Sequence, residues 1–285
     1  MAIVLALLCA CTYGIADYSG GRASRSIAST LVAFGGQGIS LILVGLALLL
    51  THAESPTMSD LAWGSLGGLF GAFGLVAFYH ALAHAAVTVI APITAVVSAV
   101  LPVVVGICLG ERPSLLAFAG IAAAILAVAL VSGALGSTPV HVEWRMILLA
   151  VFAGLSFGVI FVALAQTRSD SGLWPLFAAR ATSVPAIGLV VATQWKRGQL
   201  SGRRVAFVVW MLVPLSGILD MLANLFYLTA TRQPNGALTI VAVVASLYPV
   251  STVLLAFAFD RERVTKWQVV GMFLAAVALG GVSFG

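Results

Sequence analysis

Charged residues are scarce in this sequence. Only 8% of its 285 residues are Asp, Glu, Lys or Arg, whereas a soluble domain carries about 25%. Hydrophobic residues make up 61% of the chain. This balance excludes an ordinary soluble protein and indicates an integral membrane protein, whose few charges mainly decide which loops face the cytoplasm.

Cysteine is also rare, and the usual motifs of enzymes and nucleic-acid-binding proteins are missing. Cys9, Cys11 and Cys108 all lie in apolar runs, so their spacing favours neither a disulfide framework nor a zinc site. The sequence contains no nucleophile elbow, phosphate loop or metal triad, and no basic segment with interleaved aromatic residues. We therefore expect no catalytic residue, no metal, no cofactor and no nucleic-acid partner.

What the chain does contain is a series of ten long apolar segments. They run roughly over residues 2–21, 28–50, 61–82, 86–109, 115–135, 144–166, 172–194, 205–231, 236–259 and 267–284. The first has no charged leader and is interrupted by Asp17, so we expect a retained span rather than a cleaved signal peptide. The sequence predicts an all-α protein with ten transmembrane helices, in which neighbours along the chain are antiparallel neighbours in space.

An internal repeat divides these segments into two sets of five. Gly110-Glu111-Arg112 follows the fourth segment and Arg261-Glu262-Arg263 follows the ninth, so that the two glutamates are 151 residues apart. Tyr13-Gly14 in the first segment corresponds to Phe157-Gly158 in the sixth, at an offset of 144. The boundary between the halves falls in the connection after the fifth segment.

The two predicted halves are residues 1–138 and residues 139–285. Five is an odd number of spans, so the second half enters the membrane from the opposite side and the halves form an inverted repeat. Transporters often use this architecture, with the substrate site near the midplane between the halves.

The basic residues favour one orientation in the membrane. Of the fourteen Lys and Arg residues, ten lie in or beside odd-numbered connections and three in or beside even-numbered ones, while Arg180 lies within a span. The positive-inside rule, taken alone, places the odd connections in the cytoplasm and both termini outside.

The eighth apolar segment carries a polar stripe. Ser216, Asp220, Asn224 and Tyr227 are spaced by four, four and three residues, which places them on one face of a helix. Asp220 lies near the middle of the span, where an ionisable side chain costs at least about 2.5 kcal/mol unless it meets a partner or a water-filled cavity. The stripe indicates either polar contacts between packed helices or, as we prefer, a surface that handles substrate or protons.

Arg180 and Asp220 are expected at similar depth. They lie 15 and 16 residues from the connection at 195–204, which corresponds to about 22–24 Å along each helix. An ion pair would explain how both charges are retained in the membrane, with or without a role in transport. If the two do not meet, Asp220 becomes the better candidate for proton coupling.

Asp17 is the third charge within the spans. It lies one helical turn after Tyr13 on the same face. It either faces a cavity or, as we slightly prefer, reaches toward Arg22 or Arg25 at the end of the span.

Aromatic and proline residues add two further features. Tyrosine offers an apolar ring and a hydroxyl group, so tyrosines within the spans are candidates for lining a solute cavity, with ordinary helix packing as the alternative. Pro92 and Pro102 lie in the fourth segment, Pro214 in the eighth and Pro249 in the ninth. Each removes a backbone donor and is expected to kink its helix.

The ten spans, the two five-span repeats and the acidic junctions around Glu111 and Glu262 resemble the EamA family of the drug/metabolite transporter superfamily. The opening stretch Tyr13–Gly21 is also similar to the start of many bacterial members. Two departures stand out. Many members carry a basic residue in the second span, where this chain has Gln37, and the resemblance implies cytoplasmic termini, in conflict with the charge bias.

The resemblance implies a monomeric, basket-shaped carrier in the bacterial cytoplasmic membrane. Its central cavity would be lined mainly by spans 1, 3, 4, 6, 8 and 9. Family members move amino acids, metabolites or drugs, mostly outward, so we expect a multi-pass exporter that is not an enzyme. Its partners would be a small solute, membrane lipid and, where transport is coupled, protons.

Our hypothesis is an alternating-access carrier of small organic solutes. The expected substrate-binding residues are Tyr13, Tyr79, Asp220, Asn224, Tyr227 and Tyr248. Asp220, Arg180 and Asp17 are the candidates for coupling or ion pairing. A lipid flippase that uses Arg180 as a phosphate ligand, and a membrane-embedded enzyme, are the alternatives.

Overall fold

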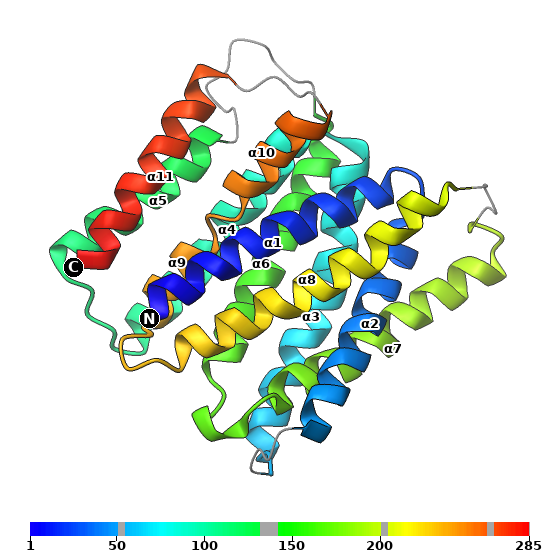
Figure 1. The fold of residues 1–285 in the computed structure, drawn as a ribbon, viewed down its shortest axis with the longest axis horizontal. Coiled ribbons are helices and arrows are strands. Elements are labelled where there is room, and N and C mark those ends of the chain that lie inside the picture. The colour runs from blue at the N-terminus through cyan, green and yellow to red at the C-terminus, as the bar shows by residue number, and fades with distance from the viewer. Residues whose placement is uncertain (51–54, 132–141, 201–204, 261–264, 285) are drawn as a thin grey trace.

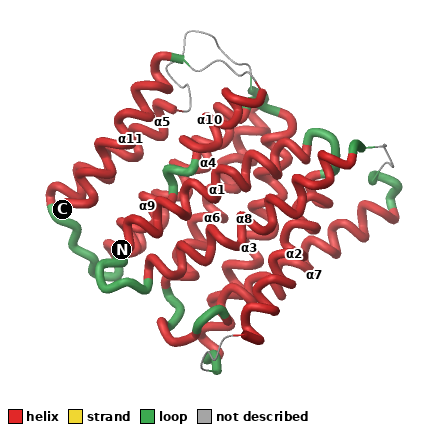
Figure 2. The backbone as a smooth tube through the Cα atoms, in the orientation of Figure 1, coloured by secondary structure: helices red, strands yellow, loops and turns green. Residues whose placement is uncertain are grey.

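The computed structural model describes residues 1–50, 55–131, 142–200, 205–260 and 265–284. Within this part of the chain every regular element is a helix (Figure 2). The helices are α1 (Ala2–Ser24), α2 (Ser29–Leu50), α3 (Met58–His84), α4 (Val87–Cys108), α5 (Leu115–Val131), α6 (Trp144–Ala165), the short 3-10 helix η1 (Ser169–Ser171), α7 (Trp174–Lys196), α8 (Phe207–Thr231), α9 (Leu238–Ala245), α10 (Pro249–Asp260) and α11 (Lys266–Phe284).

Most of these helices are suited to a bilayer. In the described ranges, eight stretches are long and apolar enough to cross a membrane, with α9 and α10 taken together as Leu238–Asp260. The apolar part of α5, Leu115–Ala127, is shorter. Large apolar side chains such as Ile42, Leu189 and Phe273 are exposed on the outer surface. A lipid environment accommodates them, and the chain is a multi-pass membrane protein.

The ninth predicted segment, 236–259, is not one continuous helix. It ends as α9 at Ala245, passes through a turn over residues 246–248, and resumes as α10 at Pro249. Proline lacks a backbone N–H, and the first position of a helix is where that loss costs least. By contrast, α4 runs unbroken through Pro92 and Pro102, so neither proline ends its helix.

The helices of the two halves are interleaved. Figure 1 shows α5 beside α11 at one edge and α2 beside α7 at the opposite edge, and both pairs are in contact. Between these edges α1 packs on α8 and α3 on α6, while α4 packs on α6 and α1 on both α9 and α10. When each helix is replaced by the corresponding helix of the other half, α1 on α8 becomes α6 on α3, and α4 on α6 becomes α9 and α10 on α1. The repeat in the sequence is therefore also a repeat in the packing of the helices.

Glycines allow α1 and α6 to approach their neighbours in the same way. A Cβ atom added to Gly14 would lie 2.5 Å from the carbonyl oxygen of Tyr248, and one added to Gly158 would lie 3.3 Å from that of Ser98. Gly14 and Gly158 are the glycines that the sequence repeat pairs. Small residues at both positions therefore let backbone meet backbone, as in other membrane helix pairs.

The first acidic junction anchors a helix of the other half. Glu111 accepts hydrogen bonds from the backbone N–H groups of Leu238 (2.7 Å) and Thr239 (2.9 Å) and from the Thr239 hydroxyl (2.7 Å). Its carboxylate thus caps the first turn of α9, where a negative charge is favourable. The second junction, with Glu262, and the predicted boundary between residues 138 and 139 lie outside the described residues.

Candidate functional site

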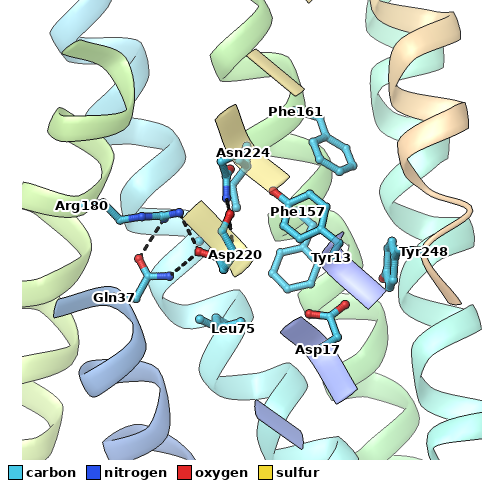
Figure 3. A pocket seen from close by; sticks show the side chains of 12 residues that line it. Tyr13, Asp17, Gln37, Leu75, Phe157, Phe161, Arg180, Asp220, Asn224 and Tyr248 are labelled. Carbon is cyan, nitrogen blue, oxygen red and sulfur yellow. Dashed lines mark hydrogen bonds and ion pairs between the residues drawn. The ribbon is translucent and has the colours of Figure 1, made fainter. Parts of the chain in front are cut away.

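A cavity lies between the two halves, with walls from α1, α2, α3, α6, α7, α8 and the turn between α9 and α10. About 460 Å³ of empty space, counted with its opening, separates the lining side chains. Its lining residues are Tyr13, Asp17, Gln37, Gly71, Leu75, Phe157, Ile160, Phe161, Arg180, Asp220, Asn224 and Tyr248 (Figure 3). Contrary to what the resemblance implies, the lining contains no residue of α4 within the described ranges, and it includes residues of α2 and α7.

An ion pair forms one wall of the cavity. The Arg180 Nη2 atom lies 2.7 Å from the Asp220 Oδ2 atom, and the two side chains are only 6% and 13% exposed. Asn224 donates to the backbone carbonyl oxygen of Asp220 at 2.8 Å, which holds it on the same face of α8. The pair compensates two charges that neither lipid nor an apolar helix contact would tolerate alone.

Gln37 connects the two members of this pair. Its Oε1 atom accepts hydrogen bonds from Arg180 (2.9 Å) and from Ser183 (2.8 Å), while its Nε2 atom donates weakly to Asp220 (3.4 Å). A neutral amide can serve both charges because it carries a donor and an acceptor. The resemblance described above implies a basic residue at this place in α2. Such a residue would compete with Arg180 for the carboxylate of Asp220, whereas Gln37 forms hydrogen bonds with both side chains.

Asp17 faces the cavity, so our preference for a contact with Arg22 or Arg25 is wrong. Both arginines pair with Asp260 at the end of α10 instead, and Arg22 also donates to Tyr18. Asp17 is 5% exposed, and its carboxylate forms no hydrogen bond or ion pair with any residue in the described ranges. In Figure 3 it lies on the side of the cavity away from Arg180.

Two of the four predicted tyrosines line the cavity. Tyr13 and Tyr248 do, with ring centroids 6.4 Å apart. Tyr79 and Tyr227 do not, and their expected place in the cavity is wrong. Tyr79 is buried against Gly20 of α1, while the hydroxyl of Tyr227 donates to the carbonyl oxygen of Phe161 at 3.1 Å. Both rings fill contacts between helices.

The polar stripe on α8 is therefore divided. Asp220 and Asn224 line the cavity, whereas the Ser216 hydroxyl donates to the carbonyl oxygen of Val213 on its own helix, at 2.9 Å. In the part of the chain that the structure describes, no group of three or more His, Cys, Asp or Glu side chains is placed to hold a metal ion. The cavity thus offers charge, amide groups and aromatic rings.

The model of the EamA-like transporter family matches residues 1–133 and again residues 144–284. The chain belongs to this family. The two matches confirm the resemblance in the sequence and show that each half carries one EamA-like unit. EamA-like proteins are membrane transporters rather than enzymes, so the cavity belongs to a transporter.

A solved structure shares the fold of this chain over its whole length. This structure, described only as "Crystal structure of protein", is 16% identical and has a TM-score of 0.76 over 99% of this chain and 98% of that one. At this identity the likeness concerns the fold alone. No curated protein sequence matches the chain.

Several lining residues of this EamA-like cavity were missed by sequence reasoning. Phe161 follows Asp17 by 144 residues, the offset that relates Tyr13 to Phe157, so the repeat itself was the signal that could have found it. Leu75 and Ile160 are apolar residues in apolar helices, and nothing in their type marks them. Only the packing of α3 on α6 and α7 turns them toward the cavity.

Proposed function

We propose that this EamA-like transporter moves small organic solutes by alternating access between two inverted repeats of five spans each. We propose further that it is an exporter of amino acids or of related metabolites and drugs, acting as a monomer in the bacterial cytoplasmic membrane. The observation that carries the proposal is the cavity itself. It is bounded by both halves and contains Arg180, Asp220 and Asp17, three ionisable side chains within membrane-spanning segments.

The arrangement around the cavity supports movement of one half against the other. The exchange-symmetric contacts allow two equivalent arrangements of the halves, which is the usual basis of alternating access. At one end of the bundle, Arg22 of α1 and Arg25, which directly follows α1, pair with Asp260 of α10. Rearrangement of these partly exposed ion pairs, together with the break between α9 and α10, would open the cavity on that side.

The contacts that the Arg180 guanidinium already makes favour a solute carrier over a lipid flippase. Its guanidinium is already bound by Asp220 and Gln37, both within hydrogen-bonding distance. A lipid phosphate would have to displace the Asp220 carboxylate from a buried site, which is costly in this environment.

Solute flux in proteoliposomes tests the proposal. A panel of amino acids and cationic drugs would be measured with and without a pH gradient, for the natural sequence, for Asp220→Asn and for Asp170→Asn as a matched control. Asp170 is an exposed carboxylate outside the cavity, paired with Arg168 at 3.3 Å. We expect flux of at least one panel member, reduced at least tenfold by Asp220→Asn and unchanged by Asp170→Asn.

Three other outcomes would count against parts of the proposal. Flux that persists in Asp220→Asn would reduce the Arg180–Asp220 pair to a structural role. Flux that ignores the pH gradient in every variant would indicate a facilitator or exchanger. Movement of a labelled lipid with no flux of any solute would refute the proposal in favour of a flippase.

A further inference from the structure

The charges that line the cavity do not balance. Arg180 and Asp220 compensate each other's charge and Gln37 forms hydrogen bonds with both, although the Arg180 Nε atom has no hydrogen-bond partner in the described residues. Asp17 is the third acidic or basic side chain in the lining, and no described residue compensates its charge when it is ionised. With all three groups ionised, the cavity carries one excess negative charge. An isolated carboxylate within a membrane protein is costly, and it is neutralised either by a proton or by a positively charged partner; an ammonium group would be such a partner and would displace the proton.

The walls near Asp17 suit an organic cation. Tyr13 lies one helical turn before Asp17. The centroid of the Tyr13 ring lies 6.4 Å from that of the Tyr248 ring (Figure 3). The Tyr13 ring lies 6.2 Å from that of Phe161, and Phe157 continues the aromatic lining on α6. Aromatic faces carry partial negative charge and attract ammonium groups within about 6 Å of the ring centre.

One polar atom beside this region is poorly satisfied. The Tyr248 hydroxyl is buried and lacks a hydrogen bond of normal geometry within the described residues, although the Ser98 side chain of α4 lies near it. A phenol can accept a hydrogen bond from an ammonium N–H. Asp17 and Tyr248 come from different halves, on α1 and on the turn between α9 and α10, so a ligand held by both would bridge the halves.

We propose that Asp17 binds the positively charged nitrogen of the transported solute, and that the substrates are amphipathic amines with a net charge of +1. This inference rests on the proposed function, and it narrows the proposed substrates from amino acids, metabolites and drugs to the cationic amines among them. The carboxylate of Asp17 and the hydroxyl of Tyr248 contact the ammonium group, and the rings of Tyr13, Phe157 and Phe161 hold the apolar body. The Arg180–Asp220 pair forms the opposite wall and stays intact.

The charge arithmetic separates amines from the other amphipathic solutes. A monocation brings the cavity to neutrality, whereas a zwitterionic amino acid leaves the excess negative charge in place and a carboxylate increases it.

Equilibrium binding to the purified, detergent-solubilised chain tests this without any flux. Isothermal titration calorimetry would compare four probes with the same phenyl body: 2-phenylethylammonium, 2-phenylethanol, 3-phenylpropanoate and phenylalanine. We expect the amine to bind at least tenfold more tightly than the other three. Preference for phenylalanine, equal binding of the alcohol, or no binding of the amine would each overturn the proposal.

Variants then locate the interaction. Asp17→Asn keeps the size of the side chain and removes its charge, so it should weaken amine binding at least tenfold and leave alcohol binding unchanged. Asp17→Glu should retain part of the preference for the amine, and the distant Asp170→Asn should bind as the natural sequence does. Unchanged amine binding in Asp17→Asn would refute the role of Asp17.

The two proposals can fail separately. Amine binding that depends on Asp17, with no flux in proteoliposomes, would leave the binding site intact and refute the transport proposal for these solutes. Flux of an amino acid that is unaffected by Asp17→Asn would support the transport proposal and refute the binding of the substrate by Asp17. The comparison of the four probes needs no variant, so the test does not depend on whether Asp17→Asn folds.

Discussion

Replacing Asp220 by Asn should destabilise the folded chain far more than removing an exposed carboxylate does. In the structure, Asp220 pairs with Arg180 at 2.7 Å, and the Arg180 side chain is 6% exposed. Asp220→Asn leaves the guanidinium charged and buried, with only the amide oxygen of Gln37 as a strong acceptor. Loss of one partner from a buried pair typically costs about 3–5 kcal/mol. We expect a value near the lower limit, about 3 kcal/mol, because an oxygen atom remains at position 220.

A double variant separates the cost of the unpaired charge from the cost of lost contacts. Arg180→Met combined with Asp220→Leu removes both charges and keeps much of the volume, which is often nearly neutral for stability. Gln37 then retains its hydrogen bond from Ser183 but loses its two charged partners. We therefore expect a loss of about 1 kcal/mol, less than half of that of the single variant.

Equilibrium unfolding in mixed micelles with increasing dodecyl sulfate, followed by circular dichroism, measures these differences. The control is Asp170→Asn, whose pair with Arg168 has side chains that are 45% and 43% exposed. Such a pair contributes at most about 1 kcal/mol. If Asp220→Asn matched Asp170→Asn to within about 0.5 kcal/mol, or if the double variant were less stable than the single one, the reasoning about the buried pair would be wrong.

Four further substitutions test the packing. Gly68→Ala should destabilise the chain by several kcal/mol, since its Cβ would collide with backbone atoms of α7, while Gly38→Ala, with open space at its Cβ, should add about 0.5–1 kcal/mol of stability in the same unfolding assay. Glu111→Gln should cost about 1–2 kcal/mol by weakening the cap of α9, seen as faster hydrogen exchange of that helix. Tyr227→Phe should cost about 1 kcal/mol through the lost hydrogen bond to α6, with solute binding unchanged in calorimetry; a large loss of binding would place this ring in the cavity after all.

The depth of a charged residue in the membrane predicts its contacts more reliably than the chemical type of a tyrosine predicts its place in the cavity. Counting residues from a shared connection put Arg180 and Asp220 at one level, and rigid helices on either side of a short connection leave little freedom in that level. Tyr79 and Tyr227 were assigned to the cavity on the strength of their chemistry. Chemistry alone does not say which way a ring points, and the hydroxyl of Tyr227 reaches a backbone carbonyl as readily as a solute.

Asp17 shows how neighbours outside a helix decide its interactions. The nearest cations along the chain are Arg22 and Arg25, which made a local contact the better expectation. Asp260, at the far end of the sequence, lies next to both arginines because α10 packs against α1. Because both arginines pair with Asp260, the Asp17 side chain faces the cavity. This outcome depends on contacts between residues more than 200 positions apart in the sequence.

The sequence by itself determined that the chain is a multi-pass helical membrane protein and that it consists of two repeats. Both are local or periodic properties, since a bilayer requires long apolar helices wherever the chain crosses it and a repeat is visible as a constant offset. The tertiary structure alone decided the rotation of each helix about its axis, the break between α9 and α10 within one apolar segment, and the role of Gln37 between two charges. These depend on which side chains and glycines meet across helices. Apart from the polar stripe of α8, whose Asp220 and Asn224 line the cavity, the apolar segments have no polar face that predicts their rotation.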